Sequence, residues 1–291
     1  MQGIITKLIG GTYSVCASDS VYECKARGVF RKKGIAPVCG DNVEIETDND
    51  IAVITKVYER RSFIVRPPLA NLDCLVLVNS VVSPPVNLEI VDKFSAVAVH
   101  KGIEPIIVFT KTDLENAGEF ADIYKSCGFK TFCINNNISE DSKPLKDYLR
   151  GKISAFTGNT GVGKSSLINN MFGKIIVDTN EISQKLGRGK HTTRHTELYP
   201  IDGGGYIADT PGFSTFETNK YEIIKKEELA FCFPEFEKHL DKCRFLDCTH
   251  TSEPQCEIIK AVELGEIKQS RYQSYKKMYE EAKGIKEWEI G

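Results

Sequence analysis

The stretch that decides the fold is Gly158-Asn159-Thr160-Gly161-Val162-Gly163-Lys164-Ser165-Ser166, and it matches the pattern G-x-x-x-x-G-K-[ST]. Residues 152–157 before it are typical of a short buried strand, and residues 166–172 after it are typical of a helix ended by Gly173. In a Gly-rich turn between strand and helix, backbone N–H groups can point at phosphate oxygens, and the helix dipole adds to the attraction. A chance match in an ordinary Gly-rich turn is the alternative, but strand, loop and helix follow in the order that the mechanism needs. The stretch therefore predicts a nucleoside-triphosphate site.

The side chains of this loop have expected roles of their own. Lys164 would reach the β- and γ-phosphates and assist catalysis, and the Ser165 hydroxyl would occupy one Mg²⁺ position. The whole loop is expected to contact the nucleotide, which makes its candidate binding residues Gly158, Asn159, Thr160, Gly161, Val162, Gly163, Lys164, Ser165 and Ser166.

The composition is that of a globular protein without a membrane span. The 291 residues are 41% hydrophobic and 27% charged, with a formal net charge of −2. No stretch approaches the ~18–20 consecutive apolar residues of a membrane span, and the first residues lack the apolar run of a signal peptide. We therefore expect a cytoplasmic protein that acts as a monomer. In that compartment the ten cysteines would stay reduced.

Residues 1–66 contain about five short runs rich in β-branched residues, separated by Gly or Asp/Asn turns. Short strands at this spacing predict a small closed barrel, and an OB-fold is the natural candidate. A basic stretch with one aromatic residue could bind a nucleic-acid backbone and stack on a base. The alternative is a solvated loop with ordinary surface charge. The RNA-binding candidates are Lys25, Arg27, Phe30, Arg31, Lys32 and Lys33.

The pattern changes after the barrel, where residues 73–80 and 104–110 form continuous apolar runs separated by a helical pattern over 88–100. Strands that alternate with helices predict a mostly parallel sheet over 67–217. Beyond it, residues 221–233, 257–264 and 270–283 are expected to be helical, so we assign 218–291 to a small helical domain. The fold class is thus a multidomain α/β protein.

Two further motifs extend the nucleotide site. Asp209-Thr-Pro-Gly212 closes a strand and resembles the D-x-x-G of GTPases, in which the Asp holds Mg²⁺ through water and the Gly N–H meets the γ-phosphate. Either Thr192 or Thr193, in the polar stretch upstream, could complete the Mg²⁺ coordination, and we favour Thr193. The expected magnesium ligands are therefore Ser165, Thr193 and Asp209, and Gly212 joins the nucleotide-binding set.

Thr110-Lys111-Thr112-Asp113 follows a buried strand and resembles N-K-x-D, the guanine-specificity element. A carboxylate at Asp113 would accept two hydrogen bonds from guanine, and adenine offers no such pair. Four residues match easily by chance, but the loop at 158–166 and the D-T-P-G motif argue against that alternative. Thr110 replaces the usual Asn, so the side-chain amide that braces the loop is missing.

The order of these motifs differs from that of ordinary GTPases. Residues 110–113 precede the phosphate loop, which precedes the residues expected to sense the γ-phosphate, whereas the guanine element ordinarily comes last. Cutting and rejoining a doubly wound sheet at surface loops keeps its contacts, so a circularly permuted P-loop GTPase can still fold.

The last domain carries Cys243, Cys248, His250 and Cys256 within fourteen residues. Three thiols and one imidazole form a closed structural zinc set. The alternative is a redox cluster, which would not need His250 and would usually contain C-x-x-C. We therefore predict a helical zinc-binding domain.

The chain resembles the RsgA (YjeQ/YloQ) family of circularly permuted GTPases along essentially its full length. The resemblance is carried by Arg66-Pro67, residues 70–73, 110–113, 158–166, 189–193 and 209–213, the Cys/His set and residues 271–275. It implies an OB domain, a permuted GTPase domain and a zinc domain. It also implies that GTP is hydrolysed to GDP, with stimulation by the 30S ribosomal subunit and its 16S rRNA, late in 30S maturation.

Two other functions remain open at this point. One is a nucleotide-gated RNA-binding switch with incidental hydrolysis, and the other is a metabolic kinase, against which the D-T-P-G motif and the guanine element argue. For catalysis, Phe213 stands where Ras-like GTPases have the Gln that orients water. His191 is therefore the candidate for placing the water, with packing or RNA contact as the alternative role.

Overall fold

The computed structural model describes residues 1–28, 30, 34, 36–48, 51–174, 196–209 and 223–285. The chain divides into two compact units, the first with residues 1–76 and 136–216 and the second with residues 77–135 and 217–291. Each unit thus combines segments from two parts of the sequence. The three-domain division at residues 66 and 217 stays a prediction.

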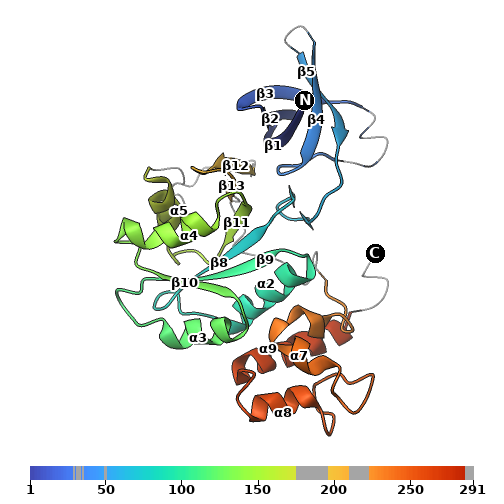
Figure 1. The fold of residues 1–291 in the computed structure, drawn as a ribbon, viewed down its shortest axis with the longest axis vertical. Coiled ribbons are helices and arrows are strands. Elements are labelled where there is room, and N and C mark those ends of the chain that lie inside the picture. The colour runs from blue at the N-terminus through green and yellow to red at the C-terminus, as the bar shows by residue number, and fades with distance from the viewer. Residues whose placement is uncertain are drawn as a thin grey trace, which may run out of the picture. The chain divides into compact units, whose positions relative to one another are not determined.

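The first unit begins with a closed five-stranded barrel (Figure 1). Antiparallel pairs join β1 to β2, β2 to β3 and β4 to β5, while β3 pairs with β5 in parallel and β4 closes the barrel onto β1. Apolar side chains from alternate positions, such as Ile5, Val15 and Ile54, are fully buried inside it. This topology confirms the predicted OB-fold. The strands are β1 (Gln2–Ile9), β2 (Thr12–Ala17), β3 (Ser20–Ala26), β4 (Asn42–Asp48) and β5 (Ile51–Val57).

A buried carboxylate holds the chain where it leaves the barrel. Asp41 is fully buried and accepts hydrogen bonds from Arg60 at 2.7 and 2.8 Å and from the Val38 N–H at 2.8 Å. The neighbouring Gly40 has a φ of +87°, and a Cβ there would lie 2.0 Å from the Ala70 carbonyl oxygen. Only glycine fits this close approach. The exit leads into the short strands β6 (Phe63–Ile64) and β7 (Leu69–Ala70).

The remainder of the first unit is built on β11 (Ile153–Thr157), whose five residues are all buried. It pairs in parallel with β13 (Tyr206–Asp209), and β12 (Glu197–Pro200) pairs antiparallel with both β13 and the barrel strand β1. A Lys7–Glu197 ion pair of 2.8 Å lies at the β1–β12 contact. The helical elements are η1 (Ser139–Ser142), α4 (Lys143–Tyr148) and α5 (Lys164–Phe172).

The second unit holds a sheet of β8 (Cys74–Ser80, which starts in the first unit), β9 (Glu104–Thr110) and β10 (Lys130–Ile134), in the order β8-β9-β10. The β9–β10 pair is parallel, as the alternation of strands and helices predicts. Helices α2 (Leu88–His100) and α3 (Gly118–Ser126) lie on one side of these strands (Figure 1). The side chain of Asn87 caps α2 by accepting from the Ile90 N–H.

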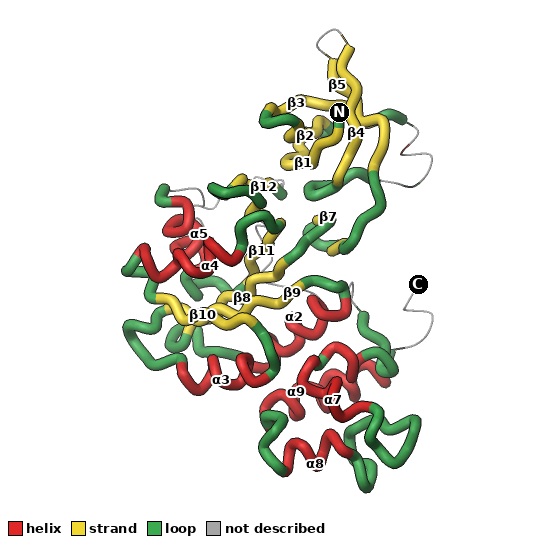
Figure 2. Tube along the Cα trace, in the orientation of Figure 1, coloured by secondary structure: helices red, strands yellow, loops and turns green. Residues whose placement is uncertain are grey.

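The end of the chain is helical, although the helix expected over 221–233 is wrong for the part that the structure describes. Residues 223–228 form loop and turn, followed by the short η3 (Leu229–Cys232). Phe233 is extended because it precedes Pro234, and a residue before proline avoids the α conformation. The other elements are η4 (Pro234–Phe236) and the helices α7 (Glu237–Leu240), α8 (Glu257–Glu263) and α9 (Gln269–Lys283), and Figure 2 shows these three helices. Among the described helices, none is long and apolar enough to cross a membrane.

A buried arginine joins this tail to α2. Arg271 of α9 is fully buried and donates to Glu235 of η4 at 2.7 and 3.3 Å and to Asp92 of α2 at 2.7 Å. The Tyr124 hydroxyl of α3 donates to the same Asp92 oxygen at 2.9 Å, and the guanidinium also lies 4.6 Å from the centre of the Phe233 ring. Four elements of the second unit therefore meet around one cation.

We predict that Arg271→Met destabilises the second unit by roughly 3–5 kcal/mol, because it leaves two buried carboxylates without their cation. Urea unfolding followed by circular dichroism, with hydrogen exchange at α2 and α9, measures the change. The control is Lys277→Met, which removes an exposed pair with Glu89 and should cost at most about 1 kcal/mol. Equal stability of the two variants would contradict a structural role for the Arg271 ion pairs.

Candidate functional site

The phosphate-binding loop has the predicted strand–loop–helix arrangement. Buried β11 ends at Thr157, and α5 begins at Lys164, directly after the loop. Gly163, the N-cap of α5, has a φ of +89°, and as a glycine it has no side chain to cap the first-turn N–H groups. Val162 is buried and anchors the loop. The first turn of α5 is therefore arranged to offer backbone donors to an anion.

Asp209 belongs to the same edge of the sheet as this loop. In the parallel β11–β13 pair, Ala155 is opposite Ala208, so both strands end within a few residues of this point. β11 runs on into Gly158, and β13 ends at Asp209. The topology thus brings the expected magnesium ligand Asp209 and the loop to one edge. His191, Thr192, Thr193 and Gly212 lie outside the described residues.

The guanine element is held by the end of β8. Thr110 is fully buried, and its hydroxyl donates to the Asn79 carbonyl at 3.1 Å, while the Val81 N–H donates to the Thr110 carbonyl at 3.3 Å. Lys111 has a φ of +60° and donates through Nζ to the Ser83 carbonyl. The threonine that replaces Asn thus has a bracing contact of its own, made by a hydroxyl to β8.

Asp113 is exposed at the turn after Lys111, where the Leu114 N–H donates to the Lys111 carbonyl at 3.0 Å. A hollow of about 460 Å³ lies beside it, lined by residues 112–118 and by the side of α3 with Ala121 and Lys125. The carboxylate proposed to read guanine is therefore accessible from solvent.

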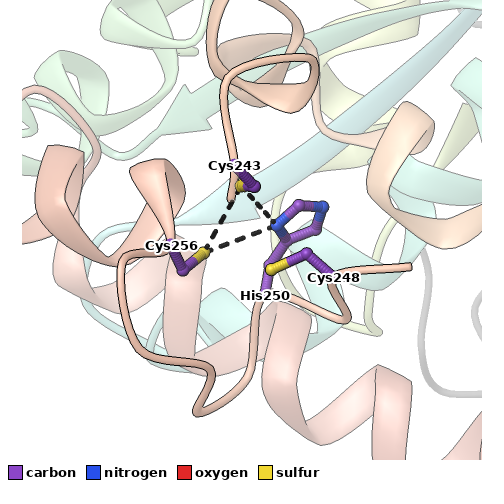
Figure 3. Close-up of side chains that lie close together, drawn as sticks. All are labelled: Cys243, Cys248, His250 and Cys256. Atoms are coloured by element: carbon purple, nitrogen blue, oxygen red, sulfur yellow. Dashed lines mark hydrogen bonds between the residues drawn. The ribbon is translucent and has the colours of Figure 1, made fainter. Parts of the chain in front are cut away.

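The predicted metal ligands come together in the second unit. The Cys243 and Cys256 sulfurs are 3.8 Å apart, and the Nδ1 atom of His250 lies 3.5 Å from each of them (Figure 3). The ligand atom of Cys248 completes a cluster in which all four lie within 4.8 Å of one another. A tetrahedral zinc ion with Zn–S bonds of about 2.3 Å and a Zn–N bond of about 2.0 Å holds sulfurs about 3.8 Å apart and sulfur and nitrogen about 3.5 Å apart. The cluster has the dimensions of a zinc site.

Burial sets the protonation of these groups in the metal-free chain. Desolvation raises the pKa of the Cys256 thiol to about 12, raises that of Cys248 and lowers the pKa of His250. The lowered pKa favours the neutral imidazole that a metal ligand needs, while the raised pKa values favour the protonated thiols of Cys248 and Cys256. A divalent cation would supply the charge that stabilises thiolates, so a metal fits this donor set.

The loop that carries the cluster is fixed by hydrogen bonds. The Glu253 carboxylate accepts from the N–H groups of Thr249 and Thr251 at 2.8 and 3.0 Å. Burial alone would raise the pKa of Glu253, but bonds from the Thr249 side chain and neighbouring backbone outweigh it and lower the pKa to about 2. The hydroxyls of Tyr272 and Tyr275 on α9 donate to loop carbonyls at 3.1 and 2.7 Å.

The aromatic residue of the basic stretch in the barrel domain is buried, contrary to the prediction that it binds a base. Phe30 is 6% exposed, so the prediction that it stacks on a base from the surface is wrong for this structure. A ring with that much apolar area is more stable buried than in water. Lys25 and Arg27 are exposed, where Lys25 donates to Thr12 and Arg27 pairs with Glu46. Arg31, Lys32 and Lys33 lie outside the described residues.

One residue of the phosphate site was missed in the sequence. The Asn136 side-chain amide donates to the Gly163 carbonyl at 3.0 Å, although it lies 27 positions before it. Its position just after β10 was the available signal, since residues that follow the strands of an α/β sheet gather at the carboxyl ends of those strands.

Comparison with known proteins agrees with these observations. The family models for the RsgA GTPase and the RsgA N-terminal domain match residues 57–219 and 2–54. The protein named "Small ribosomal subunit biogenesis GTPase RsgA 1" of Listeria monocytogenes serotype 4b (strain F2365) is 41% identical, over 98% of this chain and 99% of its own.

Two solved structures are similar as well. The crystal structure of YjeQ from Thermotoga maritima is 34% identical, with a TM-score of 0.84 over 98% of this chain and 99% of its own. YloQ, described as a circularly permuted GTPase, is 32% identical, with a TM-score of 0.82 over 98% and 96% of the two chains. With both domain models matched and this identity along almost the entire sequence, the chain belongs to the RsgA family of circularly permuted GTPases.

Proposed function

We propose that this enzyme hydrolyses GTP on the small ribosomal subunit during late 30S maturation, and that the subunit stimulates the reaction. The observation that carries the nucleotide part is the start of α5, where Gly163 cannot cap the helix and Lys164 follows immediately. The proposed partner comes from the relatives, whose names describe them as small ribosomal subunit biogenesis GTPases. We also propose that the protein acts as a cytoplasmic monomer.

The residues of the nucleotide site divide the work between phosphate, metal and base. The backbone of 158–166 would bind the phosphates, and Lys164 would neutralise the charge that develops on the transferred group. Ser165, Thr193 and Asp209 would hold Mg²⁺, which would neutralise negative charge on the phosphate oxygens. Asp113 would accept from the guanine base, in the accessible position that it has beside Thr112.

The exposed basic side chains of the barrel support contact with 16S rRNA. Lys25 and Arg27 lie on one strand and its end, and their present partners are a hydroxyl and an exposed carboxylate. Exposed ion pairs contribute little to stability, so exchanging Glu46 for a phosphate costs the barrel little. Such contacts position a protein on RNA without reading its sequence.

Hydrolysis by the isolated protein should be slow. Phosphoryl transfer depends on positioning and on charge stabilisation, and Phe213 cannot orient the attacking water through a hydrogen bond. We propose that His191 places the water once the subunit has bound. A group used only in the transition state affects turnover and leaves ground-state affinity unchanged.

Steady-state GTP turnover with and without purified small subunits tests this function. The wild type should be stimulated, and His191→Ala should lose most of the stimulated kcat while keeping its affinity for GTP and for subunits. His100→Ala, at the exposed end of α2, is the matched control and should behave as wild type. RNA binding without any stimulation of turnover would instead favour a nucleotide-gated RNA-binding switch. Full stimulation of the His191→Ala variant would mean that another group positions the attacking water.

We further propose that Cys243, Cys248, His250 and Cys256 hold one structural zinc ion. The distances among their ligand atoms support this assignment, because three of them equal those of a tetrahedral ion. The ion would organise the tail and take no part in hydrolysis, since a closed four-ligand site leaves no position for a substrate.

Elemental analysis should find one zinc per chain in the wild type and almost none in Cys256→Ser. Cys133→Ser, which alters an exposed cysteine outside the cluster, should keep its zinc. Chelation should increase hydrogen exchange in residues 243–256 more than in the sheet, because the energy of metal binding is folding energy for its loop. Zinc-free wild-type protein with an ordered tail would rule out the assignment.

A further inference from the structure

We infer that Asn136 is the positioning residue of the phosphate loop, and that it supplies the side-chain amide that the guanine element lacks. The inference rests on the proposed binding of GTP and GDP. It assigns a role in the phosphate half of the site to a residue outside every recognised motif.

Asn136 contacts α5 at both of its ends. Its Nδ2 atom donates to the carbonyl of Gly163, the N-cap, at 3.0 Å, and its own backbone carbonyl accepts from Asn170 Nδ2 at 2.7 Å. Asn170 lies in the last turn of the nine-residue helix. The two bonds therefore fix both the start of α5 and its direction relative to the chain after β10.

The bond to Gly163 controls a phosphate donor through the geometry of one peptide. In a trans peptide the C=O of one residue and the N–H of the next point in opposite directions within one plane. The Gly163 carbonyl accepts from Asn136 and from the Leu167 N–H at 2.9 Å, so two donors hold the orientation of that plane. The Lys164 N–H must then point the opposite way, away from the following turns of α5.

The peptide between Gly163 and Lys164 needs the hydrogen bond from Asn136 because the loop before it is rich in glycine. Gly163 has a φ of +89° and Gly161 has a φ of +81°, and glycine loses more conformational freedom on folding than any other residue. Without the Asn136 amide, part of that freedom would return in the empty site. Nucleotide binding would then have to pay for ordering the loop, which lowers affinity.

The orientation of the amide is determined by its acceptor. With Nδ2 on the Gly163 carbonyl, the Asn136 Oδ1 atom is buried and has no hydrogen-bond partner among the described residues. The reverse orientation of the amide would place the Asn136 Oδ1 atom against the Gly163 carbonyl oxygen, and both are acceptors. Asn136→Asp imposes that repulsion, so it should be worse than Asn136→Ala, which only removes the donor.

The hydroxyl of Thr110 makes a different contact. It donates to Asn79 of β8, within the second unit. Asn136 follows two residues after Ile134, which is opposite Thr110 in the parallel β9–β10 pair. The bracing amide of this protein therefore comes from the chain just after β10 and follows the guanine element in the sequence.

Titration of the full-length protein with fluorescent GDP and GTP tests the inference. Asn136→Ala should bind both about tenfold more weakly, the loss expected for one such hydrogen bond, and Asn136→Asp more weakly still. The exposed neighbour gives the control Asn137→Ala, which should stay within twofold of wild type. In turnover assays Asn136→Ala should raise KM for GTP and leave kcat nearly unchanged, since the brace acts in ground and transition states alike.

A second test, in the Asp113→Asn variant, distinguishes an effect on phosphate binding from an effect on base recognition. Asp113→Asn should favour binding of xanthosine diphosphate, whose C2 oxygen needs a hydrogen-bond donor. Adding Asn136→Ala to this variant should weaken its affinity for xanthosine diphosphate by the same factor of about ten. A loss confined to guanine nucleotides would make Asn136 a base-reading residue and overturn the inference. Affinity within twofold of wild type in Asn136→Ala would overturn it as well.

A purely structural effect has a different signature. It would lower the fraction of active protein, and hence kcat and binding stoichiometry, at unchanged affinity. If Asn136→Ala fails to fold, Asn170→Ala removes the second bond and should weaken GDP binding by a smaller factor, about threefold, at full stoichiometry. Absence of GDP binding by the wild type would refute the proposed function and leave the bond between Asn136 and Gly163 without a role.

Discussion

The orientation of the peptide between Gly163 and Lys164 is the constraint on which the chemistry of this protein depends. Backbone N–H groups can bind a phosphate only if their peptide planes are fixed before the ligand arrives. Buried β11 supplies one anchor, α5 supplies the second, and the Asn136 amide supplies the third. The circular permutation leaves this arrangement intact, because it changes which loops connect the strands and keeps the order of strands around β11.

The second unit depends on a buried charge instead. Helix α9 directs Arg271 to Asp92 on α2 and directs Tyr272 and Tyr275 to the loop of the metal cluster. The same helix therefore connects the candidate zinc site with α2, which leads directly into β9 and the guanine element. The tail and the strand that precedes Asp113 are therefore connected through α2.

Local patterns allowed the prediction of the barrel, the phosphate loop and the Cys/His cluster. Each depends on residues that are close in the sequence, so spacing and residue type are sufficient. The failures concern contacts between distant residues. Phe30 looked exposed beside basic neighbours but is buried, and the helix expected before Phe233 is interrupted because Pro234 and the packing against Tyr275 override the helical pattern. Arg271 and Asp92 are 179 positions apart, and no local pattern pairs them.

The central proposal is that a single guanine nucleotide binds to the loop at 158–166 and to Asp113 despite their reversed order in the chain. A crystal structure of the protein with Mg²⁺ and a non-hydrolysable GTP analogue tests this most directly. The account predicts the β-phosphate on the backbone N–H groups around Lys164, Mg²⁺ on Ser165, and the base on the Asp113 carboxylate. An analogue bound with its phosphates away from the loop, or with its base away from Asp113, would contradict the claim.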